Sequence, residues 1–357
     1  MRVQSKAGTP QRPSQTMPRL NRTVLVSGGL ALAAFLAIGF TLASPGRRAA
    51  PAPPRPEPVA GGDVAALASR PHLLFRHAGL GANARRLSLA SIEDPDAPFG
   101  VTNLECDRIA YAAGRGICLR ETGGLLSRFE AVLFDSAFRP GATVKLDGNP
   151  SRTRISPDGR FGAITVFLTG QAHGYASASF STKTTLLEMS SGTVVSDLEQ
   201  FQTWRDGEKF SAADFNFWGV TFARDSNTLY ASLWSAKKTY LVGGDVAARK
   251  LTVLRENVEC PSLSPDNRRI AFKKRVGGDL APWRFYVLDL ATMTEHPLAA
   301  EARSIDDQIE WFDDSHVLYG ASRGSQSAVL DVWIAPVDAG GPARAFLLQA
   351  TSPIVVR

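Results

Sequence analysis

The residues with the clearest capacity to bind a partner lie in an aromatic segment between Phe201 and Trp218. This segment, FQTWRDGEKFSAADFNFW, holds six aromatic residues in 18 positions, whereas aromatics make up 9% of the whole chain. Large aromatic and guanidinium side chains on an exposed loop are the usual anchors of protein interfaces. Trp204 and Phe210 flank a predicted turn at Asp206-Gly207 and are expected to be exposed. Packing of the aromatics in the core is the alternative, and the sequence leaves it open. The candidate contact residues are Trp204, Arg205, Asp206 and Phe210.

A second candidate is the polar, glycine-rich run GQAHGYASASF at residues 170–180. It contains His173 and Tyr175, whose side chains could form hydrogen bonds with a ligand at the mouth of a channel. A long loop without a binding role is the alternative.

The sequence contains no motif for catalysis or cofactor binding. It has no Gly-x-Ser-x-Gly elbow, His-Glu-x-x-His, Cys-x-x-Cys, phosphate loop or calcium loop. Gly114-Arg115-Gly116 lacks the third glycine of a dinucleotide fingerprint and reads as a hairpin turn. We therefore expect no cofactor and no metal. The histidines lack ligand spacing and are mostly expected at the surface or in turns; they are His72, His77, His173, His296 and His316.

An acidic run lies near the C-terminal end of the chain. Such a cluster could attract a cation, but solvated turn residues are the preferred interpretation. The acids are Asp306, Asp307, Glu310, Asp313 and Asp314.

The chain has three cysteines, Cys106, Cys118 and Cys260. Cys106 and Cys118 lie on the two sides of a predicted hairpin and could form a disulfide in an oxidising compartment. Three small buried side chains are the alternative. In both interpretations Cys260 is an unpaired, buried thiol.

The formal net charge of +6 is concentrated at the N-terminus. The first 57 residues hold eight of the 40 basic residues and one of the 34 acidic residues, so the remainder carries a net charge of −1. A body with this balance does not offer the basic surface that phosphate backbones require. We therefore expect no nucleic acid partner.

An uncharged run from Thr23 to Ala43 explains why basic residues are concentrated at the N-terminus. Its 21 residues are enough for a helix to span the hydrocarbon core of a bilayer. Five basic residues precede it and two follow it, which predicts a short cytoplasmic tail, residues 1–22, and an exported body. Cleavage of this run as a signal peptide, giving a secreted protein, is the alternative.

The segment after the uncharged run reads as a spacer. Residues 44–62 contain six prolines in 19 positions, which favours extended polyproline II geometry over helix or sheet. The spacer would hold the body away from the membrane.

From about Val64 onward the chain is a succession of short β-branched and aromatic runs separated by turn residues. The turn Ser156-Pro157-Asp158-Gly159 aligns with Ser264-Pro265-Asp266-Asn267, and an apolar strand follows each. Proline fixes the turn, aspartate accepts hydrogen bonds from the next backbone amides, and Gly or Asn tolerates positive φ. Three weaker copies are expected in the same register at Asp107, Asp225 and Asp313-Asp314.

The spacing of these turns predicts the architecture. Four strands in a unit of about 50 residues form one blade of a β-propeller. Residues 64–357 accommodate six such units, the first of them degenerate and starting near His72. We therefore expect an all-β, six-bladed β-propeller, which the terminal strand Ile354-Val355-Val356 closes by pairing with an early strand.

The Ser-Pro-Asp-Gly turns and the downstream strand Tyr286-Val287-Leu288-Asp289-Leu290 resemble the WD-repeat-like blades of the TolB C-terminal propeller. The resemblance covers about residues 66–357 and implies a propeller outside the cytoplasm that binds proteins. The N-terminal α/β domain of TolB has no counterpart in this chain, because the anchor and spacer occupy its place.

Together these features predict a membrane-anchored, extracytoplasmic, non-enzymatic scaffold that binds envelope or membrane proteins. The first alternative is a propeller hydrolase or lyase with dispersed catalytic residues. The hydrolase or lyase alternative requires at least two of its candidate catalytic residues to meet at one mouth of the channel. The second alternative is a sensor for a small ligand at the same mouth. The candidate catalytic set is His173, Asp206, Asp214 and His316.

Overall fold

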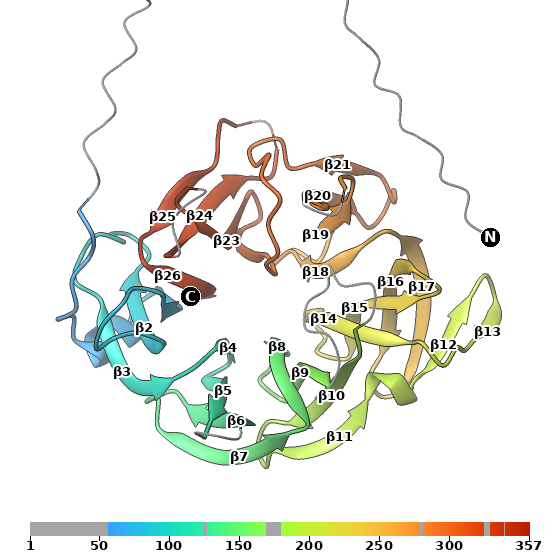
Figure 1. Ribbon diagram of the computed structural model, residues 1–357, viewed down its shortest axis with the longest axis horizontal. Coiled ribbons are helices and arrows are strands. Elements are labelled where there is room, and N and C mark those ends of the chain that lie inside the picture. Colours follow the sequence, from blue (N-terminus) through green and yellow to red (C-terminus); the bar gives the residue numbers. More distant parts are fainter. Residues whose placement is uncertain (1–55, 124–126, 169–179, 279–280, 325–328, 339) are drawn as a thin grey trace, which may run out of the picture. The chain divides into compact units, whose positions relative to one another are not determined.

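The computed structural model describes residues 56–123, 127–168, 180–278, 281–324, 329–338 and 340–357. The described residues form six sheets of mainly antiparallel strands around a central axis (Figure 1). This architecture is a six-bladed β-propeller. The expected all-β class and blade number are therefore confirmed. In the described part of the chain no helix combines the length and apolar character needed to cross a bilayer, and the run from Thr23 to Ala43 lies outside it.

The blades are numbered here from the blade that contains both ends of the ring, and the strands of each are given from the axis outward. Blade 1 consists of β26 (Ala350–Val356), β1 (His72–His77), β2 (Arg86–Ser91) and β3 (Gly100–Glu105). Blade 2 consists of β4 (Arg108–Ala112), β5 (Arg115–Thr122), β6 (Arg128–Asp135) and β7 (Pro140–Leu146). Blade 3 consists of β8 (Gly148–Ile155), β9 (Phe161–Leu168), β10 (Thr182–Glu188) and β11 (Thr193–Asp197).

The remaining three blades follow in chain order. Blade 4 consists of β14 (Asn216–Phe222), β15 (Thr228–Ser235), β16 (Lys238–Asp245), β17 (Lys250–Glu256), β12 (Gln202–Arg205) and β13 (Glu208–Phe210). Blade 5 consists of β18 (Glu259–Leu263), β19 (Arg269–Arg275), β20 (Trp283–Asp289) and β21 (Glu295–Pro297). Blade 6 consists of β22 (Glu310–Asp313), β23 (His316–Ser322), β24 (Leu330–Pro336) and β25 (Arg344–Leu347).

Burial along the strands explains why the blades stack. Strands near the axis are covered on both faces by neighbouring blades, so β9 (FGAITVFL) and β14 (NFWGVTF) are apolar almost throughout. The outer strand β7 is mostly exposed and carries polar residues. The core is divided among the interfaces between blades, and one cluster joins Phe161 and Leu186 of blade 3 to Phe217 and Leu229 of blade 4.

The two Ser-Pro-Asp turns connect the first and second strands of blades 3 and 5. In blade 3 the Asp158 carboxylate accepts hydrogen bonds from Ser156 Oγ at 2.6 Å and Arg160 N at 2.9 Å. The same two contacts recur at Asp266, with Ser264 Oγ at 2.5 Å and Arg268 N at 3.0 Å. The turns expected near Asp225 and Asp313 are also first-to-second-strand turns.

The copy of the turn expected at Asp107 does not lie between the first and second strands of a blade. Asp107 precedes β4, the innermost strand of blade 2, so it lies in the connection between two blades. The first-to-second-strand turn of this blade is Ala113-Gly114, where φ is 47° and 75°. Adjacent left-handed residues make the tightest hairpin turn, so this blade needs no Ser-Pro-Asp sequence.

The ring closes in blade 1. The C-terminal strand β26 is its innermost strand and pairs antiparallel with β1, with Leu73 opposite Val355 and Leu74 opposite Ile354. The expected closure by the last strand is confirmed.

The end of the predicted spacer contacts the propeller. Gly61 N and Gly62 N both donate to the carbonyl of Phe99, at 3.1 and 3.0 Å. The short helix α2 (Val64–Ala68) follows, and its N-cap residue Asp63 accepts a hydrogen bond from Ala65 N at 2.9 Å. Residues 56–62 therefore belong to the propeller unit.

Candidate functional site

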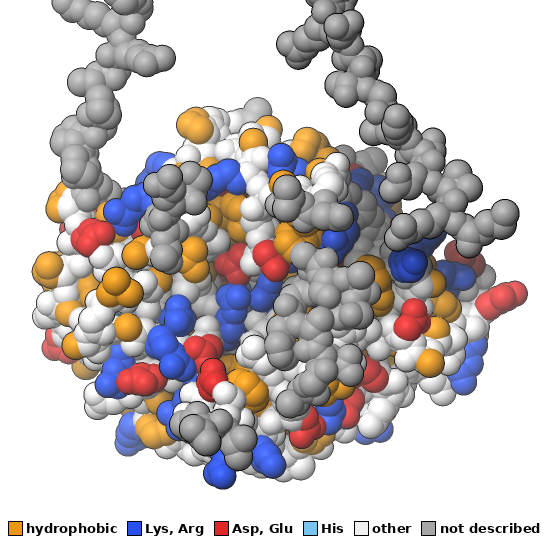
Figure 2. Space-filling model, in the orientation of Figure 1, with side chains coloured by type: hydrophobic (Ala, Val, Ile, Leu, Met, Phe, Trp, Pro, Cys, Tyr) orange, Lys and Arg blue, Asp and Glu red, His pale blue; other side chains and the backbone are white. Residues whose placement is uncertain are grey.

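A cavity of about 410 Å³ lies on the propeller axis. All six innermost strands contribute to it, and residues of the first-to-second-strand turns, such as Pro157 and Pro265, extend its lining toward that end of the channel. Seen along the axis, basic and acidic side chains gather at the centre of the ring (Figure 2). Because six strands from six blades fix its walls, the cavity is the candidate functional site.

One wall of the channel is basic. Arg108 lies on β4, and Arg152 and Arg154 lie on β8. Side chains two residues apart on a strand point to the same face, so Arg152 and Arg154 reach the same side of blade 3.

The opposite wall is acidic and comes from the segment that leads into β22 of blade 6. Arg108 Nη1 lies 3.2 Å from Asp307 Oδ1, and Arg152 Nη2 lies 3.1 Å from Asp306 Oδ1. Arg154 Nη1 forms an ion pair with Glu310 Oε2. Ion pairs therefore join blades 2 and 3 to blade 6 across the channel.

Asp306 pairs with two buried cations, although its own side chain is 38% exposed. Its carboxylate also pairs with Lys273 of β19, whose side chain is fully buried. Burial opposes ionisation of Asp306, but Lys273 and Arg152 outweigh this effect and lower the pKa of the carboxyl to about 2. Lys273 Nζ also lies 4.3 Å from the ring centroid of Trp283. This group links blades 3, 5 and 6.

Hydrogen bonds with backbone groups, as well as ion pairs, hold the segment between Asp306 and Glu310 in place. Asp307 Oδ2 accepts a hydrogen bond from Gly320 N at 2.8 Å. Gln308 Nε2 donates to the carbonyls of Val220 at 3.3 Å and Pro261 at 3.4 Å. The segment is thus fastened to blades 4, 5 and 6 and positions its carboxylates along the axis.

The acidic run was expected to be solvated turn residues, and the structure corrects this for two of its five members, Asp307 and Glu310. Asp313 and Asp314 do lie at the β22–β23 turn, and Asp306 is exposed although it pairs with Arg152. Asp307 and Glu310 line the channel and form ion pairs. Sequence reasoning also missed all three arginines. The only local signal for them is the two-residue spacing of Arg152 and Arg154 just before the Ser156 turn.

The aromatic segment mainly packs into the propeller. Phe201, Phe217 and Trp218 are buried. The insertion forms the hairpin β12–β13, and β12 adds in parallel to β17 at the outer edge of blade 4. The candidate contact residues therefore lie at the periphery of the ring and away from the axial cavity (Figure 1).

The two aromatics expected to be exposed in this hairpin are half-buried. Phe210 contacts the ring of Phe215, with centroids 4.9 Å apart, and Trp204 lies 5.0 Å from Lys250 Nζ. Arg205 covers the Phe210 ring, whereas the Asp206 side chain at the turn is 94% exposed. Packing between strands accounts for the aromatics, because they cover the core of blade 4.

The three described members of the candidate catalytic set, Asp206, Asp214 and His316, are not brought together at one site. Asp214 accepts hydrogen bonds from Ser235 Oγ and Ala236 N, both at 2.7 Å, which holds the β15–β16 turn. His316 Nδ1 lies 3.1 Å from Asp313 Oδ1 in blade 6, and Asp206 lies at the tip of the outer hairpin. His173 and Tyr175 lie outside the described residues.

Two histidines differ from the expected surface placement. His72 and His77 of β1 are 3% and 6% exposed. Burial lowers the pKa of both imidazoles. Their place on β1, beneath the closing strand, explains the burial.

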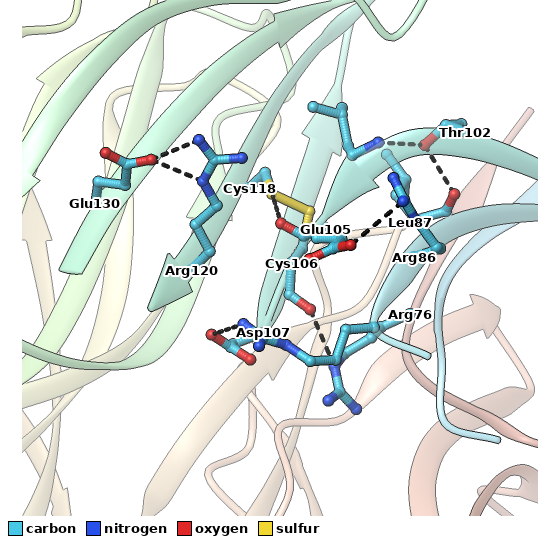
Figure 3. Close-up of a disulfide and its surroundings, with 12 residues drawn as sticks. Arg76, Arg86, Leu87, Thr102, Glu105, Cys106, Asp107, Cys118, Arg120 and Glu130 are labelled. Carbon is cyan, nitrogen blue, oxygen red and sulfur yellow. Dashed lines mark hydrogen bonds and ion pairs between the residues drawn. A yellow bond between two sulfur atoms is a disulfide. The ribbon is translucent and has the colours of Figure 1, made fainter. Parts of the chain in front are cut away.

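Cys106 and Cys118 form a disulfide between the start of blade 2 and its second strand (Figure 3). Both residues are fully buried, and Arg76 Nε of blade 1 donates to the Cys106 carbonyl at 3.0 Å. The close-up also shows the ion pair between Arg120 and Glu130 on β5 and β6, at 2.6 Å. Cys260 is a free, buried cysteine, as expected.

Comparisons with known proteins show the fold. TolB from Acinetobacter baumannii is 15% identical, with a TM-score of 0.53 over 79% of this chain and 65% of the TolB chain. A chain of the nidogen/laminin complex is 11% identical, with a TM-score of 0.53 over 79% of this chain and 96% of that chain. This chain therefore spans less than two thirds of the TolB structure. The similarities support a TolB-like six-bladed propeller at the level of fold.

No protein-family model matches the chain, and no curated protein sequence matches it. Function must therefore be argued from the site itself.

Proposed function

We propose that this protein is a membrane-anchored, extracytoplasmic propeller that acts as a non-enzymatic scaffold and binds an envelope or membrane protein through the axial cavity. The observation that carries the proposal is the cavity of about 410 Å³ lined by all six innermost strands. Rigid strands present the charged and apolar groups of this cavity at fixed positions, which suits selective binding.

Two features support the placement outside the cytoplasm. The uncharged run from Thr23 to Ala43, with its basic flank, has the character of an anchor whose N-terminus stays in the cytoplasm. The disulfide between Cys106 and Cys118 favours an oxidising compartment.

The cavity offers both kinds of contact that a protein segment needs. Arg108, Arg154 and Glu310 supply charged hydrogen-bonding groups, and Tyr111 and Phe222 supply apolar surface beside them. A partner segment could bury apolar side chains there while its polar groups find partners.

The test is a crosslinking pull-down from intact membranes with three versions of the chain. We expect Arg154→Gln to lose a specific envelope protein that the native chain captures. The hairpin variant Trp204→Ala, Phe210→Ala should retain that partner, because the hairpin lies at the outer edge of blade 4. Loss of the partner only in the hairpin variant would move the binding surface to blade 4. Absence of any captured partner would contradict the scaffold proposal.

A further inference from the structure

We infer that the group recognised in the axial cavity is a carboxylate on an apolar body, and that it takes the place of Glu310 on Arg154. The inference rests on the proposed binding role of the cavity and adds the chemistry of what is bound.

The charges of the cavity lining favour an anion. Five arginines line it, compared with two acids, Asp307 and Glu310, and a third acid, Asp306, pairs with Arg152 from outside the lining. A cavity with this excess of positive charge and low-dielectric walls concentrates anions. The arginines are Arg108, Arg152, Arg154, Arg224 and Arg357.

The two arginines nearest the first-to-second-strand turns are held by carbonyl groups. Arg224 Nη2 donates to the Pro265 carbonyl at 2.7 Å, and Arg357 donates to the Phe312 carbonyl. Carbonyl contacts position a guanidinium without neutralising it, so these side chains add to the attraction for an anion at this end of the cavity.

The three acids of the opposite wall differ in how firmly they are held. Asp306 pairs with both Lys273 and Arg152. Asp307 pairs with Arg108 and also accepts from the backbone of Gly320. Among the described contacts Glu310 has the single partner Arg154, and its side chain is 16% exposed, compared with 8% for Asp307 and 38% for the doubly paired Asp306. The Glu310 carboxylate is therefore the one that an incoming carboxylate can replace with least disruption.

Arg154 is built to change its carboxylate partner without losing its position. Its Nη2 donates to the Ile309 carbonyl at 3.2 Å and to Ser262 Oγ at 3.4 Å, in addition to the Glu310 pair at Nη1. These two contacts remain when Glu310 leaves. Exchange of one carboxylate for another preserves the charge-assisted hydrogen bond of Arg154.

The surroundings of Arg154 call for an apolar body on the ligand. Trp311 Nε1 donates to the Ser262 carbonyl at 2.8 Å, so the polar group of this indole is already satisfied. Trp311, Phe222, Leu263 and Ile354 line the same cavity. A carboxylate on an aromatic or aliphatic body would match both features. It could be a small organic acid or the acidic side chain of a partner protein.

The experiment is a ligand-observed NMR titration of the full-length chain in detergent with phenylacetate and its neutral isostere phenylacetamide. We expect phenylacetate to bind and the amide to bind at least about tenfold more weakly, because the amide lacks the charge that pairs with Arg154. Glu310→Gln should raise phenylacetate affinity about threefold or more, since the competing carboxylate is gone. Arg154→Gln should lower it by about tenfold or more.

The matched controls are Arg120→Gln and Glu130→Gln, which break an ion pair of 2.6 Å on blade 2 outside the cavity lining. Both should leave phenylacetate affinity unchanged. Glu310→Gln is a nearly isosteric substitution that we expect to raise phenylacetate affinity. Misfolding cannot produce such a rise. Equal binding of acid and amide, or affinities that neither cavity variant changes, would overturn the inference.

A second arm distinguishes the two sources of the carboxylate. The peptides Ac-Leu-Asp-Leu-amide and Ac-Leu-Asn-Leu-amide differ only in one side-chain charge. Selective binding of the aspartyl peptide assigns the site to an acidic side chain of a protein, and binding of phenylacetate alone assigns it to a small organic acid; both support carboxylate recognition. Carboxylate binding without a captured partner would refute only the scaffold proposal, and partner capture without carboxylate binding would refute only this inference.

Discussion

Most buried charges in this propeller have several partners at once. Glu259, which is fully buried, accepts hydrogen bonds from Arg275 at 2.6 Å and from Trp283 Nε1 at 3.1 Å. Removing one partner from such a group leaves a buried charge uncompensated, which costs several kcal/mol. Glu199 differs, because the described donors to its carboxylate are backbone amides, that of Thr184 at 3.1 and 3.3 Å and its own.

Glu199 should make stability depend on pH. Burial raises its pKa to about 7 from 4.5, with Asp197 adding to the rise and Lys183 opposing it. The folded state therefore holds a proton that the unfolded state releases between these values, so this contribution is complete below about pH 4.5 and is lost as pH rises through 7. The loss is on the order of 3 kcal/mol.

Urea unfolding at pH 4.5, 6 and 8 checks the Glu199 prediction. Glu199→Gln should lack the decline in unfolding free energy between pH 4.5 and 7, and Glu93→Gln, at an exposed acid, should retain it. A native pH profile reproduced by Glu199→Gln would show that another group is responsible.

The disulfide strengthens the start of blade 2. Cys106 precedes β4, and Cys118 lies on β5 opposite Ile109 of β4. Both cysteines pack with Leu74 and Leu87 of blade 1, so the bond stabilises the interface next to the seam of the ring.

Loss of this disulfide should lower the free energy of unfolding by about 3 kcal/mol, because it closes a short loop in the unfolded chain. The measurement is urea unfolding of the native chain with and without reductant, beside the double variant Cys106→Ala, Cys118→Ala. Reductant should destabilise only the native chain. Equal stability of the native and double-variant chains would refute the prediction.

At the scale of the whole molecule, the ring depends on one pairing between its two ends. β26 joins β1 through backbone hydrogen bonds, and Ile354 packs with residues of blades 1 and 2. All other blades in the described chain are built from consecutive or nearby strands. The seam is therefore the place where the ring can open without breaking a chain connection.

Ile354→Ala should weaken this seam. Truncating a buried isoleucine costs about 2–5 kcal/mol. We expect hydrogen exchange to accelerate most in β1 and β2, with β15 and β16 of blade 4 as the internal reference. Uniform acceleration in all six blades would mean that the seam is no weaker than the other interfaces.

The fold was largely predictable because its signals are local. Ser156 and Asp158, or Ser264 and Asp266, form their turns within a few residues, and the disulfide links cysteines 12 positions apart. The phase of blade 2 was wrong because its copy was aligned on Asp107, whereas the hairpin turn predicted at Gly114 is the first-to-second-strand turn. The aromatic segment was recognisable from its composition, but the half-buried state of Trp204 and Phe210 depends on contacts with other strands.

By itself the sequence determined the strand periodicity, the number of blades and the closing strand, because each follows from turn chemistry or apolar patterning along neighbouring residues. It offered Cys106 and Cys118 as one possible pair, which the structure confirms. Only the tertiary structure decided the candidate site. Arg154 and Glu310 are 156 residues apart, and Arg108 and Asp307 are 199 apart. Closing the ring brings these residues to one axis, and no local pattern can encode a contact that depends on the stacking of all the blades between them.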